Sequence, residues 1–288
     1  MTKLIIGASG AVGIPLIGHL VRRGENLRAL SSNETSAERL RSLGVKEVIV
    51  GDYRKEGILD PVFEGVEAVC YIPPRFVGDE FEIGKKVVAA ARKAQVSQFL
   101  FCSAFQPQLQ ELGHHWQKLQ LEALLVESDL MATVVHPTMF MQNLRVEWPQ
   151  ITEHGRYSRP YSPDAPLNVI DTGDLGEAMA KIMTQPELQG ATYQLSGDGP
   201  ISHAEMAKQI SDEIGRPVEA IKRDINDWKT WAAGRGWSDY GIETYVKMCD
   251  HYDKHGYKYA NPFTLTALLG RPPVKFPEFL KAFVQAQN

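Results

Sequence analysis

Residues 4–13 read Leu-Ile-Ile-Gly-Ala-Ser-Gly-Ala-Val-Gly, and Ile14–Arg23 continues with the apolar spacing of a helix. In such a turn one glycine allows the tight bend, one lets the backbone approach a pyrophosphate, and one lets the helix pack on the strand. The phosphates would be held by free N–H groups at the positive end of the helix. The alternative is an ordinary turn without a ligand. The predicted dinucleotide contacts in this turn are Gly7, Ser9, Gly10, Ala11, Val12 and Gly13.

The composition is that of a globular protein. The chain has 288 residues, of which 43% are hydrophobic and 23% charged, and its net charge is −4, which gives no electrostatic reason to expect nucleic acid. No apolar run is long enough for a membrane span, and the first residues do not resemble a signal peptide. Cys70, Cys102 and Cys249 lack metal-ligand spacing. We expect a cytoplasmic protein that binds a small-molecule substrate, with no metal, nucleic acid or membrane; the oligomeric state is left open.

The first half of the chain alternates short apolar segments with helical ones. Repeated units of this length predict parallel strands joined by right-handed crossovers. Strands that are almost continuously apolar indicate a sheet covered on both faces. The predicted strands are residues 3–6, 26–30, 47–50, 68–72, 99–102 and 133–136, and the predicted helices are 13–23, 36–43, 82–93 and 114–127. The expected fold is therefore α/β, with a doubly wound parallel Rossmann sheet.

The pattern changes in the second half. Residues 147–167 contain four prolines and are predicted to form a loop. Asp174–Met183 is predicted to be a helix and residues 191–195 a strand. Ser202 and Glu205 have the spacing of a capping box, which predicts the start of another helix.

The C-terminal part is predicted to be smaller and mainly helical. We predict a dinucleotide-binding domain over residues 1–148, to which 166–185 returns, and a substrate-binding region over 149–288. Helix packing is the favoured role for the aromatic residues of this region, and a pocket for a flat substrate is the alternative. These residues are Trp228, Trp231, Trp237, Tyr240, Tyr245 and Tyr252.

Several stretches match one known family in the same order along the chain. They are Leu4–Gly13, Val48–Tyr53, Gly65–Pro74, Phe99–Phe105, His114–Leu130, His136–Leu144, Asn168–Ala180 and residues 193–202. With these motifs the chain resembles the NmrA-like family of atypical short-chain dehydrogenases/reductases. The resemblance implies an NAD(P)-binding Rossmann fold. The family includes reductases of quinones and of triarylmethane and azo dyes, biosynthetic reductases and members that only sense dinucleotides, so fold alone does not settle the activity.

The resemblance places the adenosine ribose of the cofactor at the end of the second predicted strand, at Ser31, Ser32 and Asn33. Relatives that use NADP often carry arginine where this chain has Ser32, whereas an acid in this region selects NAD. This chain has neither, so we expect weak discrimination, with NADP as the cofactor on family grounds and NAD also accepted. Arg28 lies nearby in the sequence. The alternative for Ser31–Asn33 is a plain turn and helix cap.

The resemblance also assigns contacts along the carboxyl edge of the sheet, where ligands bind in such folds. Asp52 would contact the adenine; its alternative is a turn residue bonded to its own backbone. Ile72 and Pro73 would line the cofactor where the fourth predicted strand ends. Pro137 and Thr138 resemble the segment that flanks the nicotinamide.

The predicted catalytic residues are Lys118 and His114. The superfamily uses Tyr-x-x-x-Lys on a helix, where the lysine holds the nicotinamide ribose and the tyrosine transfers a proton. Here Lys118 matches the lysine, and His114 replaces the tyrosine on the same helix face. Imidazole titrates near neutrality, so His114 could donate the proton. Ser103 matches the catalytic-serine region and is also predicted to contact the cofactor. The predicted substrate contacts are Phe105, Phe140 and Met141.

Two functions are compatible with these residues. The first is an NAD(P)H-dependent reductase that transfers hydride from nicotinamide to a small, aromatic or quinone-like substrate. The second is a non-catalytic NAD(P) sensor of the NmrA type that binds a protein partner. Lys118 favours the reductase, whereas the missing tyrosine and the missing phosphate-binding arginine favour the sensor.

Overall fold

The computed structural model describes residues 2–287 and divides the chain into two compact units. The first unit comprises Met1–Pro137 and Thr172–Gln194, and the second comprises Thr138–Asp171 and Leu195–Asn288. The chain thus leaves the first unit after Pro137 and returns to it at Thr172. The predicted assignment of cofactor and substrate binding to residues 1–148 and 149–288 stays a prediction.

A seven-stranded sheet forms the centre of the first unit. Its strands are β1 (Thr2–Ile6), β2 (Asn26–Ser31), β3 (Glu47–Val50), β4 (Val66–Tyr71), β5 (Gln98–Cys102), β6 (Ala132–Pro137) and β10 (Thr192–Leu195), in the order β10-β6-β5-β4-β1-β2-β3. All pairings among β1–β6 are parallel. The strand order reverses next to β1, where the glycine turn begins. The predicted Rossmann sheet is confirmed.

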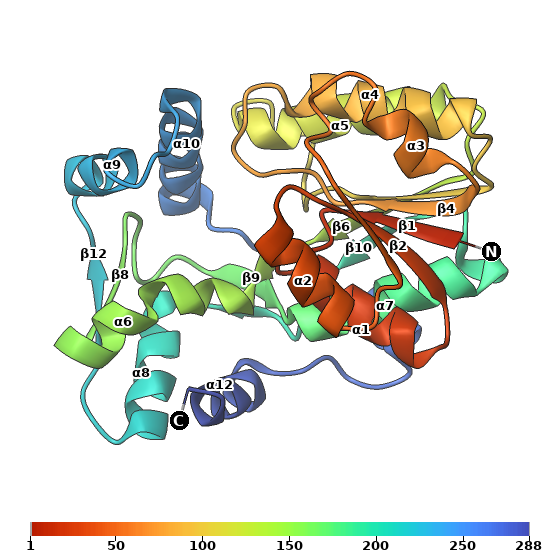
Figure 1. The fold of residues 1–288 in the computed structure, drawn as a ribbon. Helices are drawn as coiled ribbons and strands as arrows, with labels where there is room; N and C mark the ends of the chain where they lie inside the picture. The colour runs from red at the N-terminus through yellow and green to blue at the C-terminus, as the bar shows by residue number, and fades with distance from the viewer. Residues whose placement is uncertain (1, 288) are drawn as a thin grey trace. The chain divides into compact units, whose positions relative to one another are not determined.

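Helices cover both faces of this sheet (Figure 1). They are α1 (Gly13–Arg22), α2 (Glu34–Ser42) and α7 (Thr172–Thr184) on one face, and α3 (Leu59–Phe63), α4 (Glu80–Lys93) and α5 (Gly113–Val126) on the other. Helices α1 and α7 pack so closely that a Cβ atom at Gly176 would lie 2.7 Å from the backbone nitrogen of Leu16. On the other face, Phe99, Phe101 and Val87 belong to one buried apolar cluster.

The second unit combines short strands with helices. A three-stranded sheet contains β11 (Pro200–Ile201), β9 (Leu167–Ile170) and β7 (Met139–Phe140), and β8 (Arg156–Arg159) pairs in parallel with β12 (Glu219–Lys222). The helices are α6 (Leu144–His154), α8 (His203–Ile214), α9 (Ile225–Ala233), α10 (Asp239–His255), α11 (Phe263–Leu269) and α12 (Phe276–Gln285). The predicted helical character of the chain from Trp228 onward is confirmed.

The prediction of a loop over residues 147–167 is wrong. Helix α6 occupies the first part of this stretch and includes Pro149. It buries Leu144 and Ile151, which lie two turns apart on one face, and it ends at Gly155 in the left-handed conformation with φ 65°. The other three prolines lie in the connection between β8 and β9. Burial of the apolar face of α6 therefore outweighs the helix-breaking tendency of Pro149.

Other local predictions for the second unit are confirmed. Ser202 and Glu205 form the predicted capping box at the start of α8. The rings of Trp228 and Tyr245 stack with their centroids 4.1 Å apart, and both side chains are buried together with Tyr252. Trp228 and Tyr245 therefore pack α9 against α10, which is the role favoured from the sequence, whereas the ring of Tyr252 lies 5.3 Å from that of Tyr161.

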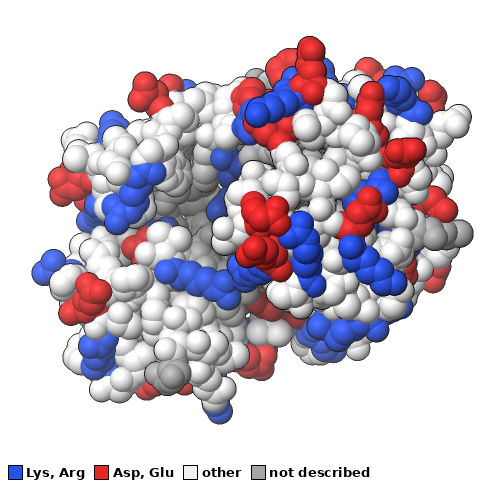
Figure 2. All heavy atoms as spheres, in the orientation of Figure 1, with Lys and Arg blue, Asp and Glu red and all other residues white. Residues whose placement is uncertain are grey.

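The three cysteine thiols are buried. Burial raises the pKa of Cys70 well above its usual range and that of Cys102 to about 12, so both thiols stay protonated. Across residues 2–287, no helix is long and apolar enough to cross a membrane, and no cluster of metal-ligating side chains was found. On the face drawn in Figure 2, basic and acidic side chains are interspersed.

Candidate active site

The turn between β1 and α1 contains two glycines that the protein itself requires. Gly7 has φ +84°, and a Cβ atom there would lie 2.8 Å from the Cβ of Ile72 and closer still to its carbonyl oxygen. A Cβ atom at Gly13 would overlap with the carbonyl oxygens of Gly7 and Ala8. Both positions therefore exclude side chains because of packing inside the first unit.

Gly10 differs from these two glycines. It is exposed, its φ is not positive, and an added Cβ atom would meet only the carbonyl oxygen of Gly7, at 3.3 Å. Packing within the protein thus restricts this position less than it restricts Gly7 and Gly13. A missing side chain that leaves open space above a turn is what close approach of a pyrophosphate needs.

The first turn of α1 is suited to hold an anion. Its N-cap residue, Val12, makes no side-chain cap, and the first turn contains no acidic residue. The positive end of the helix is therefore not compensated by a nearby side chain. Ser9 and Ala11 are exposed beside Gly10 at this end. These features fit a dinucleotide pyrophosphate.

The end of β2 is occupied by local hydrogen bonds. The side chain of Asn33 accepts from the backbone N–H of Ser36 at 2.9 Å, so it caps α2, as the alternative interpretation proposed. The hydroxyl of Ser31 donates to the carbonyl of Asn33 at 2.9 Å. Ser32 is exposed.

Neither nearby arginine is placed to bind a phosphate beside Ser32. Arg28 donates to the carbonyls of Val62 and Glu64 and lies 2.8 Å from the carboxylate of Glu47. Arg39 belongs to the last turn of α2, at the end remote from Asn33. An arginine clamp for the 2′-phosphate of NADP is therefore missing at both positions.

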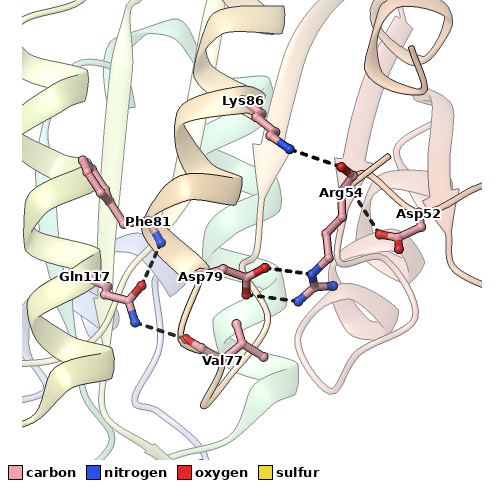
Figure 3. A network of polar contacts seen from close by, with 7 residues as sticks. All are labelled: Asp52, Arg54, Val77, Asp79, Phe81, Lys86 and Gln117. Atoms are coloured by element: carbon pink, nitrogen blue, oxygen red, sulfur yellow. Dashed lines mark hydrogen bonds and ion pairs between the residues drawn. The ribbon is translucent and has the colours of Figure 1, made fainter. Parts of the chain in front are cut away.

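Polar contacts tie the segment after β3 to the start of α4 (Figure 3). Asp52 accepts from the backbone N–H of Arg54 at 2.9 Å, which is the turn predicted as its alternative role. The guanidinium of Arg54 pairs with Asp79 at 3.0 Å, and Lys86 donates to the carbonyl of Arg54. Gln117 of α5 bonds the backbone on either side of Asp79. Asp52, the residue predicted to contact the adenine, thus lies in a segment that is held to α4 by polar contacts.

Both predicted catalytic residues lie buried on α5, four residues apart. The ammonium of Lys118 forms an ion pair with Glu80, and the two side chains are only 7% and 2% exposed. The ring of His114 lies 4.8 Å from that of Phe76, which has the unusual φ of 58°. Burial holds the pKa of His114 well below its usual range, with smaller contributions from nearby cations, so His114 is neutral at pH 7.

A second carboxylate lies one turn further along α5. Glu122 accepts the hydroxyl hydrogen of Ser103, which directly follows β5, and its Oε1 lies 3.0 Å from Nε2 of His136 on β6. Ser103 is therefore fixed by the protein. The sequence analysis missed Glu122 and Glu80; the spacing of four from Lys118 could have indicated Glu122, whereas Glu80 comes from another helix and left no local signal.

The remaining predicted residues fall in different units. Ile72 and Pro73 follow β4 beside Gly7, and Pro137 ends β6, all in the first unit. Thr138, Phe140 and Met141 belong to the second unit, where Thr138 is buried with its hydroxyl unpartnered. The side chain of Phe105 is fully buried and presents no surface to a ligand, so it belongs to the core and its predicted contact with substrate is not favoured.

Comparison with known proteins identifies the relatives of this chain. It is 26% identical over 297 residues to an NAD(P)H azoreductase from Xenophilus azovorans, covering 98% of each chain. The fold matches the NADPH complex of the quinone oxidoreductase QOR2 from Escherichia coli with a TM-score of 0.84 at 22% identity, covering 98% and 99% of the chains. It also matches NmrA, a negative transcriptional regulator, in complex with NAD (TM-score 0.80, 17% identity, 99% and 96% covered). The model of the NmrA-like family matches residues 2–267, and the chain belongs to this family.

Proposed function

We propose that this protein is an NAD(P)H-dependent reductase that transfers hydride from nicotinamide to a small aromatic or quinone-like molecule. The observation that carries the proposal is the turn at Gly10, which is exposed and which the packing of the protein restricts less than it restricts Gly7 and Gly13. The azoreductase, which matches along nearly its whole length, and the fold of QOR2 support this chemistry.

The proposed cofactor is NADP, with NAD as a second choice. When bound, it would supply the hydride. The pyrophosphate would lie on the turn, the adenosine ribose at the end of β2, the adenine by Asp52, and the nicotinamide side by Ser103 and Lys118. The proposed contacts are Gly7, Ser9, Gly10, Ala11, Val12, Gly13, Ser31, Ser32, Asn33, Asp52, Ile72, Pro73, Ser103, Lys118, Pro137 and Thr138; Phe140 and Met141 would contact the substrate.

The protonation state of His114 limits its role. A neutral imidazole cannot act as a strong acid, but its N–H can still donate a hydrogen bond to a developing negative charge. We therefore propose that His114 orients the acceptor, while the proton that completes the reduction comes from water. Lys118 would bind the cofactor and carry positive charge into the site.

A sensor function remains the second candidate. The observation that favours it is the absence of a tyrosine at position 114, together with the absence of an arginine at position 32. The fold of NmrA, a regulator that binds NAD, agrees with it. In either case we propose a cytoplasmic protein that binds small molecules and has no nucleic-acid interface, in line with its net charge of −4.

The test combines binding with turnover. NADPH and NADH are titrated calorimetrically, and oxidation of each is then followed with quinones, azo dyes and triarylmethane dyes as acceptors. The reductase predicts binding and acceptor-dependent oxidation. Tight binding with no oxidation above background for any acceptor would favour the sensor, and absence of binding would contradict both functions.

A further inference from the structure

The ion pair between Lys118 and Glu80 is unusual because of its burial. Glu80 is the first residue of α4, and Lys118 lies in the middle of α5, so the pair joins two helices. By contrast, Glu82, which lies two residues further along α4, pairs with Lys85 at the surface, where the side chains are 63% and 44% exposed. Removing two charges from water costs free energy that their attraction only partly returns, so a buried pair is poorly explained by stability alone.

The carboxylate of Glu80 is buried, and Lys118 is its charged neighbour. Burial raises its pKa, and the opposing charge of Lys118 is the main influence that lowers it. Its location at the positive end of α4 also favours the ionised form. One oxygen contacts Lys118, whereas Oε2 is buried without a protein partner. Lys118 is thus the residue whose side chain contacts the carboxylate of Glu80.

Within residues 2–287, the ammonium of Lys118 has fewer hydrogen-bond acceptors around it than N–H donors. A lysine has three N–H donors. One is engaged by Glu80, and another is directed at the carbonyl of His114 over a long 3.4 Å. Among the described residues, no third hydrogen bond of this ammonium is seen. Glu80 therefore fixes the position of Lys118 from one side and leaves a donor for a hydroxyl group.

We propose that Glu80 is the positioning residue of the site: its carboxylate holds the ammonium of Lys118 in place to bind the ribose of the nicotinamide nucleotide. The inference rests on the proposed cofactor role of Lys118. Glu80 does not contact the cofactor, so it acts only through the lysine. Loss of its charge should leave the buried Lys118 with only its long contact to the carbonyl of His114, so that its side chain can turn away.

A double-mutant cycle on NADPH affinity tests this inference. Calorimetry compares the native protein with Glu80→Gln, Lys118→Met and the double variant. We expect Glu80→Gln to weaken NADPH binding about tenfold, or 1.4 kcal/mol, and to cause no further loss when Lys118 is already methionine. Glu80→Asp, which keeps the charge, should recover most of the affinity. The matched control, Glu82→Gln, removes an exposed acid from the same helix and should bind as the native protein does.

The possible results separate this inference from the proposed function. An unchanged Kd in Glu80→Gln, or the same loss with and without Lys118, would overturn the inference while leaving a reductase intact. Absence of turnover with every acceptor would overturn the reductase alone, because NADPH binding does not depend on it. If Glu80→Gln does not fold, the small loss of affinity expected for Glu80→Asp is used in its place. A loss that is seen with Lys118 and absent with Lys118→Met supports the inference, and the same loss in both backgrounds contradicts it.

Discussion

The Oε1 atom of Glu122 lies 3.0 Å from Nε2 of His136, and the same oxygen accepts the hydroxyl hydrogen of Ser103. One carboxylate on α5 therefore fixes side chains from two neighbouring strands. Hydrogen bonds to a charged group contribute about 1.5–3 kcal/mol each. We expect Glu122→Gln to lower the free energy of unfolding by about 2 kcal/mol, as measured by urea denaturation. Glu127→Gln, an exposed change one turn on, is the control, and equal stability of the two variants would contradict this assignment.

Gly10 should matter for binding and little for folding. An added Cβ atom there would meet only the carbonyl oxygen of Gly7, at 3.3 Å, and the side chain of valine would take up space above the turn. We expect Gly10→Val to weaken NADPH binding at least about tenfold, or 1.4 kcal/mol, by calorimetry, with a near-native unfolding midpoint. Gly18→Ala in the helix that follows the turn, where the added carbon meets only the Arg22 guanidinium at 3.4 Å, should bind normally. Equal affinity of all three proteins would remove the turn from the proposed site.

Cofactor choice should be weak in the native protein and should respond to Ser32. Arg28 bonds the carbonyl of Val62 and Arg39 lies in the last turn of α2, so neither is placed to bind the 2′-phosphate of NADP. We expect the Kd values of NADH and NADPH to differ by less than about a hundredfold, or 2.7 kcal/mol. Ser32→Arg should shift the preference toward NADPH by adding a charge-assisted contact. A larger native preference, or no shift in the variant, would locate the selecting residue elsewhere.

Acid should destabilise the fold through His203. This side chain is buried in the second unit, with its Nε2 3.3 Å from the hydroxyl of Tyr161, and burial holds its pKa well below 6.5. The unfolded chain binds a proton near pH 6.5 while the folded chain does not, so stability falls as the pH drops through that value. Each such histidine costs about 1.4 kcal/mol per pH unit below it.

His203→Gln tests this effect because it keeps a polar group but does not titrate. Urea denaturation at pH 7.5 and 5.5 should show a smaller loss of stability in the variant than in the native protein. His114 has a similarly lowered pKa and should supply part of the remaining loss. His154→Gln, which alters an exposed histidine, is the control. An unchanged pH dependence in His203→Gln would contradict the argument.

The Rossmann sheet could be predicted because its signals are local. Apolar strands, the spacing of Gly7, Gly10 and Gly13, and a helix after them all lie within short stretches of chain. The loop prediction for residues 147–167 was wrong for the opposite reason. Four prolines are a strong local signal for a loop, but burial of Leu144 and Ile151 depends on distant residues that only the folded chain brings together.

The site shows the same division. The sequence could place Lys118 and His114 on one helix face because that depends only on a spacing of four. It could not show that Glu80 pairs with Lys118, since the two residues come from separate helices, nor that burial keeps His114 neutral. For Asn33 and Asp52 the sequence allowed two roles, and the structure shows the hydrogen bonds of the local one in each case.

The return of the chain to the first unit at Thr172 has a consequence for synthesis. Helix α1 carries the glycine turn and packs against α7, with Gly176 set against Leu16, yet α7 leaves the ribosome long after α1. During that interval the apolar face of α1 that α7 will later cover is exposed. The edge of the sheet at β6 is unpaired until β10 is added. A shortened chain that stops at Pro137 would therefore make a poor stand-alone nucleotide-binding module, and the smallest useful one must extend through residue 194.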